Sequence, residues 1–215
     1  LRTLAFFDFK HALRLKPDLV EAYNFLGIHF TQLQQFTQAF DAFDSALDLE
    51  PEHEYAYLNR GIALYFAGRP SLAKEDLMTF LAKQSNDPYR VIWLYFAEVA
   101  MGDPQALENL NTRRAMLPNN IWGIHIVDLF LNNLPEEKLL SLVSHNVESE
   151  KELIEKLCEA YFYLGKLNEL NGNKMAAESY FKLALSTKVY EFVEHRYAKL
   201  ELDLMHVSQA EITQK

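Results

Sequence analysis

Residues 20–53 read VEAYNFLGIHFTQLQQFTQAFDAFDSALDLEPEH, and this stretch decides the fold. Small residues stand in it where two helices could cross closely, and large apolar residues surround those positions. The small residues are Gly27, Ala39 and Ala46, the large ones are Tyr23, Leu26, Phe30 and Phe43, and Pro51 follows the second half. The stretch therefore predicts a closely crossed pair of α-helices.

The same pattern recurs at a spacing of 34 residues. One step forward it falls on Tyr57, Gly61, Leu64, Ala73 and Leu77, and one step back on Ala5, Phe9, Ala12 and Pro17. It returns late in the chain at Tyr161, Leu164, Gly165, Gly172, Ala177, Phe181 and Ala184. A 34-residue helix pair with this pattern is the signature of the tetratricopeptide repeat. We therefore predict an all-α tetratricopeptide-repeat solenoid of helix pairs with a C-terminal capping helix.

The repeat register also divides the chain. We predict a single superhelical domain over residues 1–215, in which residues 1–17 form the second helix of a truncated repeat. Then come full repeats over 20–53 and 54–87, a degenerate repeat over 88–118, an irregular helix pair over 119–150 (helices 119–131 and 135–144), a full repeat over 158–191 and the capping helix over 192–206. The polar tail 208–215 is expected to be loose. Because the first repeat lacks its first helix, we expect the natural protein to extend upstream.

Composition argues against several function classes. The 215 residues carry a net charge of −9 with scattered basic residues, which disfavours nucleic acid as a partner. The single cysteine, Cys158, excludes an internal disulfide and a thiolate zinc cluster. No apolar run reaches the roughly 20 residues of a membrane span. Neither a catalytic motif nor a closely spaced histidine pair is present. We predict a protein that is not an enzyme, with no catalytic residue, metal or cofactor.

Residues on the first helix of each pair are expected to line a concave groove that binds partners. These residues are Glu21, Asn24, Ile28, Thr31 and Gln32 in one repeat, and Tyr55, Leu58, Ile62, Tyr65 and Phe66 in the next, with Asn59 beside them. Exposed aromatic patches of this kind usually contact a protein or peptide. Occlusion by the protein's own chain or by a dimer mate, and an error of register, are the alternatives. A clamp for a terminal carboxylate at Asn59 and Arg60 is a weak interpretation, because Phe25 and Leu26 occupy the matching positions of the preceding repeat.

Longer stretches resemble a family of bacterial lipoproteins, the NlpI family. They are EAYNFLGIHFTQ (21–32), AFDAFDSALDLEP (39–51), YAYLNRGIALYFAGR (55–69), NDPYRVIWLYFAE (86–98), FYLGK (162–166) and FVEHRYAKLEL (192–202). The resemblance runs from about Leu4 to Leu204 and is lower over 103–120 and in the tail. The family's N-terminal part has no counterpart in this sequence. That part carries the signal peptide and the lipid-modified cysteine, so Cys158 does not correspond to the lipidation site.

The resemblance implies a homodimer on the periplasmic face of the outer membrane, with a lipid anchor upstream of this chain as its only membrane attachment. Members of the family act as adaptors. They bind a periplasmic carboxy-terminal processing protease and bring it peptidoglycan hydrolases, notably a murein endopeptidase, for degradation. The alternative is a structural tetratricopeptide-repeat lipoprotein subunit of an envelope assembly complex.

Overall fold

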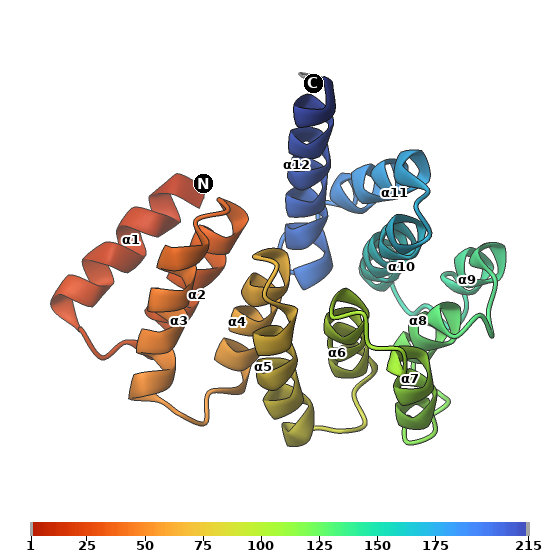
Figure 1. Ribbon diagram of the computed structural model, residues 1–215, viewed down its shortest axis with the longest axis horizontal. Coiled ribbons are helices and arrows are strands. Elements are labelled where there is room, and N and C mark those ends of the chain that lie inside the picture. Colours follow the sequence, from red (N-terminus) through yellow and green to blue (C-terminus); the bar gives the residue numbers. More distant parts are fainter. Residues whose placement is uncertain (1, 214–215) are drawn as a thin grey trace. The chain divides into compact units, whose positions relative to one another are not determined.

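The computed structural model describes the backbone of residues 2–213 and the side chains of residues 6–206, and every regular element within these ranges is an α-helix (Figure 1). The sequence predicted one domain over 1–215, whereas the helices cluster into two compact units, residues 1–119 and 120–215. The division lies one residue from the predicted boundary between the degenerate repeat and the irregular helix pair. Each unit has its own core.

The first unit is a series of helix pairs. Its helices are α1 (Arg2–Leu15), α2 (Val20–Gln32), α3 (Phe36–Leu49), α4 (Glu54–Phe66), α5 (Pro70–Lys83), α6 (Pro88–Ala100) and α7 (Ala106–Arg114). Helices α2 and α3 lie side by side, as do α4 and α5 (Figure 1). Helix α1 packs against α2, and α4 packs against both α2 and α6. Successive first helices, α2, α4 and α6, are therefore in contact from one repeat to the next.

The second unit departs further from the predicted boundaries. Its helices are α8 (Gly123–Phe130), α9 (Glu136–Leu142), α10 (Glu150–Leu170), α11 (Lys174–Ser186) and α12 (Val193–Thr213). Helix α8 was predicted to begin at residue 119, but Pro118, Asn119 and Asn120 favour a turn. The tail predicted to be loose from Ser208 is helical as far as Thr213, because no Gly or Pro interrupts that segment. Helix α12 packs against both α10 and α11.

Each full repeat closes on a contact between a glycine and a large side chain. A methyl group added at Gly165 of α10 would lie 2.5 Å from the ring of Phe181 in α11. The same addition at Gly61 of α4 would lie 2.9 Å from Leu77 of α5. Gly27 of α2 meets the ring of Phe43 in α3 in the same way. In all three repeats the glycine removes the Cβ that would push the two helices apart, and the partner side chain is fully buried.

The turn inside each repeat has one backbone design. Gly68, Gly102 and Gly172 follow α4, α6 and α10 with φ of 70°, 71° and 76°. After α4, the N–H of Gly68 donates to the carbonyl of Tyr65 (3.1 Å) and that of Arg69 to the carbonyl of Leu64 (2.9 Å). These two bonds form the Schellman motif, which satisfies the last carbonyls of a helix.

Gln34 occupies the same position after α2 with φ of 58°, and the N–H groups of Gln34 and Gln35 make the same two bonds. A residue with a Cβ loses roughly 1–2 kcal/mol in this left-handed conformation. The repeat thus keeps the same turn after α2 although Gln34, unlike glycine, is strained in the left-handed conformation.

We expect Gln34→Gly to raise the free energy of unfolding of the first unit by about 0.5–1 kcal/mol, because relief of the left-handed strain exceeds the added entropy of the unfolded chain. Gly68→Ala should lower it by about 1 kcal/mol through conformation alone, since no atom lies within 4 Å of the added methyl group. Urea unfolding followed by circular dichroism measures both. A loss of stability in Gln34→Gly would contradict the assignment.

Candidate functional site

The structure buries most of the predicted groove residues. Glu21 and Tyr55 are exposed, and Gln32, Tyr65 and Phe66 are half-buried. The remaining members of the predicted set are buried: Asn24, Ile28, Thr31, Leu58, Asn59 and Ile62. These six side chains are therefore not exposed in a groove as predicted, whereas the three aromatic members of the set keep part or most of their surface exposed.

Aromatic packing onto the next helix accounts for the partial burial of Tyr65. The ring of Tyr65 lies 6.3 Å from that of Trp93 and 6.5 Å from that of Phe96, both on α6. It also meets Phe66 edge-on at 5.2 Å. Aromatic pairs at these separations gain about 0.5–1.5 kcal/mol beyond the burial of their area. Tyr65 thus contributes to the interface with α6, which at this residue favours the alternative that the protein's own chain covers the groove, whereas Tyr55 stays exposed.

The polar members of the set connect successive first helices. Asn59 of α4 donates to the side-chain oxygen of Asn24 of α2 at 3.0 Å. His53, whose Nδ1 accepts from the N–H of Ala56 at the start of α4, brings its Nε2 to 3.1 Å from the carboxylate of Glu21. These contacts satisfy buried polar groups and fix the register of α2 against α4.

Arg90 makes the equivalent connection between α4 and α6. Its guanidinium donates to Glu54 at 2.9 Å and to the Phe80 carbonyl at 2.5 Å, and it lies 3.7 Å from the centre of the Phe80 ring. The side chain is buried, so these hydrogen bonds and the ring replace part of the water that the charge has lost, while Nε lies 3.7 Å from Asp87 without a hydrogen bond.

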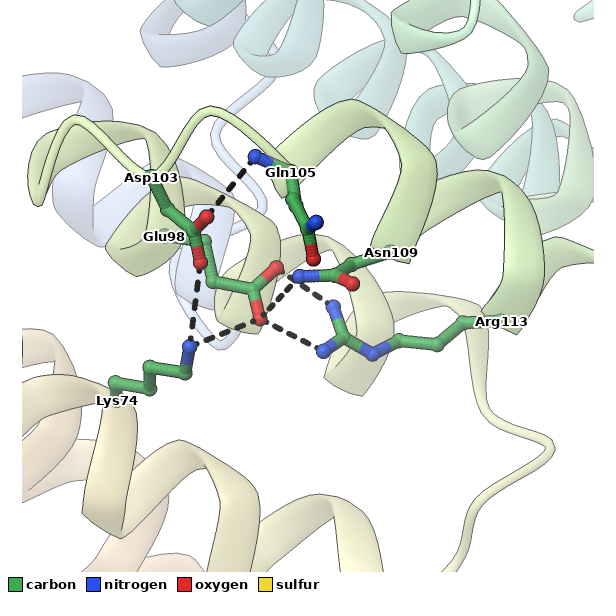
Figure 2. Close-up of polar contacts among 6 residues, drawn as sticks. All are labelled: Lys74, Glu98, Asp103, Gln105, Asn109 and Arg113. Atoms are coloured by element: carbon green, nitrogen blue, oxygen red, sulfur yellow. Dashed lines mark hydrogen bonds and ion pairs between the residues drawn. The ribbon is translucent and has the colours of Figure 1, made fainter.

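A dense polar cluster joins α5, α6 and α7 (Figure 2). The buried carboxylate of Glu98 accepts two hydrogen bonds from Arg113, at 2.7 and 2.8 Å, and lies 3.5 Å from Lys74. Lys74 also reaches Asp103 at 3.5 Å. Asp103 accepts from the backbone N–H of Gln105 at 2.9 Å, and this bond holds the pKa of its carboxyl below the usual value. The two positive charges of Lys74 and Arg113 balance the two negative charges of Glu98 and Asp103. Because these side chains come from α5, α6, α7 and the α6–α7 turn, their contacts hold the degenerate repeat against the preceding one.

A small cavity with a charge imbalance opens between α3 and α5 over α4; we call it the α3–α5 cavity. Its volume is about 220 Å³, and it is lined by Phe40, Asp44, Arg60, Leu64, Arg69, Leu72, Glu75 and Asp76. Arg60 bridges two aspartates, with two bonds to Asp76 (2.7 and 2.8 Å) and one to Asp44 (2.6 Å).

The electrostatics of this cavity favour a cation. Burial raises the pKa of Asp76 against the lowering effect of Arg60, and the carboxylates of Asp44 and Glu75 raise it further. The pKa of Arg60 is also raised, chiefly by its hydrogen bonds to Asp76, so the guanidinium stays charged. Three carboxylates against two guanidinium groups leave one excess negative charge. An ammonium or guanidinium group from a partner would balance it, with its aliphatic stem against Leu64 and Leu72.

Sequence reasoning considered Arg60 only beside the groove and missed this cavity. Asp44, Arg60 and Asp76 lie 16 residues apart in succession and belong to three different helices. The repeat register places α3 and α5 next to α4, and this is the signal from which the cluster could have been found.

In the second unit, buried charges lie between α10 and α12. Lys166 of α10 donates to Glu201 of α12 at 2.6 Å and to Glu169 at 2.5 Å, and both Lys166 and Glu201 are buried. Burial raises the pKa of Glu201 to about 7, although the Lys166 ammonium lowers it. One ammonium between two carboxylates leaves an excess negative charge when all three are ionised. Tyr163 adds a hydrogen bond to Glu194 at 2.9 Å.

Cys158 and the potential metal-ligating side chains do not form a reactive or metal-binding site among the described residues. The Cys158 side chain is buried, and burial raises the pKa of its thiol to about 12, so the thiol stays protonated at neutral pH. Among the residues that the structure describes, no three His, Cys, Asp or Glu side chains gather in a way that could hold a metal ion. Over the same residues, no helix has both the length and the apolar character needed to cross a membrane.

Solved structures of tetratricopeptide-repeat proteins share this fold. The chain is similar to a tetratricopeptide repeat protein from Parabacteroides merdae, with a TM-score of 0.55 and 17% identity over 95% of this chain and 78% of that one. It is also similar to the MamA RS-1 ArsTM double mutant, with a TM-score of 0.50 and 18% identity over 88% and 86%. No protein-family model matches the chain. The predicted all-α tetratricopeptide-repeat solenoid is confirmed, and the resemblance to the NlpI lipoproteins stays a hypothesis.

The two carboxylates around Arg60 should differ in their effect on stability. Asp76→Ala should lower the free energy of unfolding of the first unit by about 2–3 kcal/mol, because it leaves a half-buried guanidinium with only one partner. Asp44→Ala should cost less than about 1 kcal/mol, since the Asp44 side chain is 57% exposed. Urea unfolding measures both, and equal losses would contradict the assigned roles.

A second expectation concerns pH. The folded-state pKa of Glu201 lies above its unfolded value, so the folded state binds more protons and stability falls as pH rises from about 4.5 to about 7. Glu201→Gln should flatten this part of the stability curve by on the order of 3 kcal/mol. The measurement is the difference in free energy of unfolding between wild type and variant across that range. Asp203→Asn, on the same helix at a more exposed site, is the control and should leave the slope unchanged.

Proposed function

We propose that this tetratricopeptide-repeat chain is a non-enzymatic adaptor that binds proteins. In this proposal it acts on the periplasmic face of the outer membrane, as a homodimer anchored by a lipid on residues upstream of this chain. Its partners are a carboxy-terminal processing protease and peptidoglycan hydrolases of the murein endopeptidase type. Binding both would promote the regulated degradation or the assembly of the hydrolases. The partners and the location follow from the resemblance of stretches such as 21–32 and 55–69 to the NlpI lipoproteins.

The observation that carries the protein-binding role is the α3–α5 cavity. The Gly61 contact fixes α4 against α5, and α3, held on α2 by the Gly27 contact, packs against α4. The rim of the cavity includes Asp44 and Glu75, which are both exposed, and its lining residues carry one excess negative charge. A preformed cavity of this kind binds with little cost for ordering. It suits a basic side chain on the surface of a folded partner or in an extended segment.

Such an adaptor works by proximity. When protease and substrate are held on one scaffold, their encounter becomes intramolecular, with an effective concentration that reaches the millimolar range for short flexible links. The scaffold itself then needs no catalytic group. Selectivity among substrates depends on which proteins complement its surfaces.

A timed degradation assay tests the proposal. Purified processing protease and purified murein endopeptidase are incubated with and without the full-length protein, and loss of the endopeptidase is followed on gels. We expect faster loss when the protein is present. The double variant Asp44→Asn with Glu75→Gln should reduce this acceleration by about fivefold to tenfold, as expected for two exposed charge contacts.

The matched control is Asp41→Asn with Glu108→Gln, which removes two exposed carboxylates that do not line the cavity. Its acceleration should equal that of the wild type. If the endopeptidase is lost at the same rate with and without the folded protein, the adaptor role fails. Crosslinking in the envelope would then test the structural-subunit alternative.

A further inference from the structure

The second unit carries a larger and more apolar cavity, which we call the α10 cavity. Its volume is about 480 Å³, and it lies between the first turns of α10 and the connection from α11 to α12. This volume falls within the roughly 300–1,000 Å³ of typical ligand sites. None of the predicted groove residues lines it, and the groove interpretation did not include it.

The apolar part of this cavity is made by three side chains. Ile154 of α10 and Val189 are half-buried, and Tyr190 is 64% exposed. The Tyr190 ring meets His195 edge-on, with the ring centres 4.9 Å apart. His195 is buried, so the tyrosine is fixed on one side and presents its other side to the cavity. A large aromatic ring fixed in this way is a typical anchor point for a partner side chain.

The connecting segment that forms one wall is already ordered. Thr187 donates from its hydroxyl to the Ala184 carbonyl at 2.7 Å, and Phe192 donates from its N–H to the Val189 carbonyl at 3.1 Å. Arg196 of α12 donates to the Glu191 carbonyl. These bonds tie both ends of the segment to helices, so a ligand would meet a preformed wall and pay little for ordering it.

The charges around the cavity favour a basic partner over an acidic one. Three carboxylates line it, Glu150, Glu155 and Glu191, against the ammonium groups of Lys151 and Lys188. Lys151 lies 3.6 Å from Glu155, so among the lining residues one ammonium group, that of Lys188, remains for Glu150 and Glu191. The guanidinium of Arg196 does not line the cavity and is bound to the backbone carbonyl of Glu191.

The N-terminus of α10 does not reverse this preference. The hydroxyl of Ser149 accepts from the N–H of Glu152 at 3.1 Å, and Glu150 and Glu152 already place two negative charges in the first turn. An anionic ligand would therefore meet carboxylates where the helix dipole alone would attract it.

We propose that the α10 cavity binds an extended segment of a partner protein that presents a large apolar side chain next to a basic residue. The apolar side chain packs against Tyr190, Val189 and Ile154, and the basic group lies near Glu150 and Glu191. This inference rests on the proposed protein-binding function and assigns a partner chemistry to a second surface.

Three synthetic peptides labelled with fluorescein test the proposal by fluorescence anisotropy. Their sequences are GSKFLKSG, GSEFLESG and GSKSSKSG, so the second reverses the charge of the first and the third removes its apolar pair. We expect GSKFLKSG to bind at least about tenfold more tightly than either of the others at roughly 0.15 M salt. Equal binding of all three, or preference for the acidic peptide, would overturn the proposal.

Variants locate the binding. Tyr190→Ala should weaken binding of GSKFLKSG by about tenfold or more, and Lys188→Glu should tighten it by removing the competing ammonium. Phe7→Ala is the matched control, because Phe7 is 60% exposed and also contacts one ring edge-on, that of Phe6, at 5.6 Å. Thermal unfolding checks that each variant is folded. Equal losses in Tyr190→Ala and Phe7→Ala would refute the site.

The degradation assay separates failure of this inference from failure of the proposed function. If the peptide does not bind but the protein still accelerates loss of the endopeptidase, the adaptor role stands and the α10 cavity is not its partner site. If Tyr190→Ala reduces both peptide binding and acceleration, the α10 cavity holds one of the two partners. If the peptide binds in the predicted order without any acceleration, the cavity is a peptide site and the protease-adaptor role is wrong.

Discussion

The close approach of two helices at a glycine is the constraint on which the rest of this structure depends. At Gly27, Gly61 and Gly165 the missing Cβ lets a ring or a leucine of the second helix lie directly on the backbone of the first. This contact sets the spacing within each pair, and the spacing decides which side chains of the next helix can reach across. A larger residue at any of the three would force a fully buried side chain to move.

Once the pairs are set, polar side chains determine how one repeat follows another. The contacts of Glu21 with His53, of Asn24 with Asn59 and of Glu54 with Arg90 all join successive first helices. Such buried or half-buried contacts contribute modest net stability, but leaving one partner unsatisfied is costly. They therefore specify register more than they add stability. Without these contacts, the same positions on the first helices could bind a partner protein.

Periodicity predicted what depends on a single helix pair and failed where distant residues meet. The spacing of Ala39, Phe43 and Ala46 placed α3 correctly, since a helix pair repeats its own contacts. The partial burial of Tyr65 could not be deduced from its repeat, because it depends on Trp93 and Phe96 in a helix whose own repeat has degenerated. The repeat register places α3 and α5 beside α4, but the charges that meet in either cavity depend on individual side chains of these helices or of the connecting segment, and the 34-residue pattern does not specify those side chains.

The location of the cavities follows from this use of the helix faces. In the first unit, apolar and polar side chains of the first helices contact the neighbouring first helices. The α3–α5 cavity lies elsewhere, where two second helices, α3 and α5, flank the first helix α4 around Arg60. In the second unit the α10 cavity forms at a helix start and a connection. Both sites keep an excess carboxylate beside apolar side chains. A scaffold that binds through such sites selects partners by the pairing of a basic group with an apolar one, because neither feature alone complements the surface.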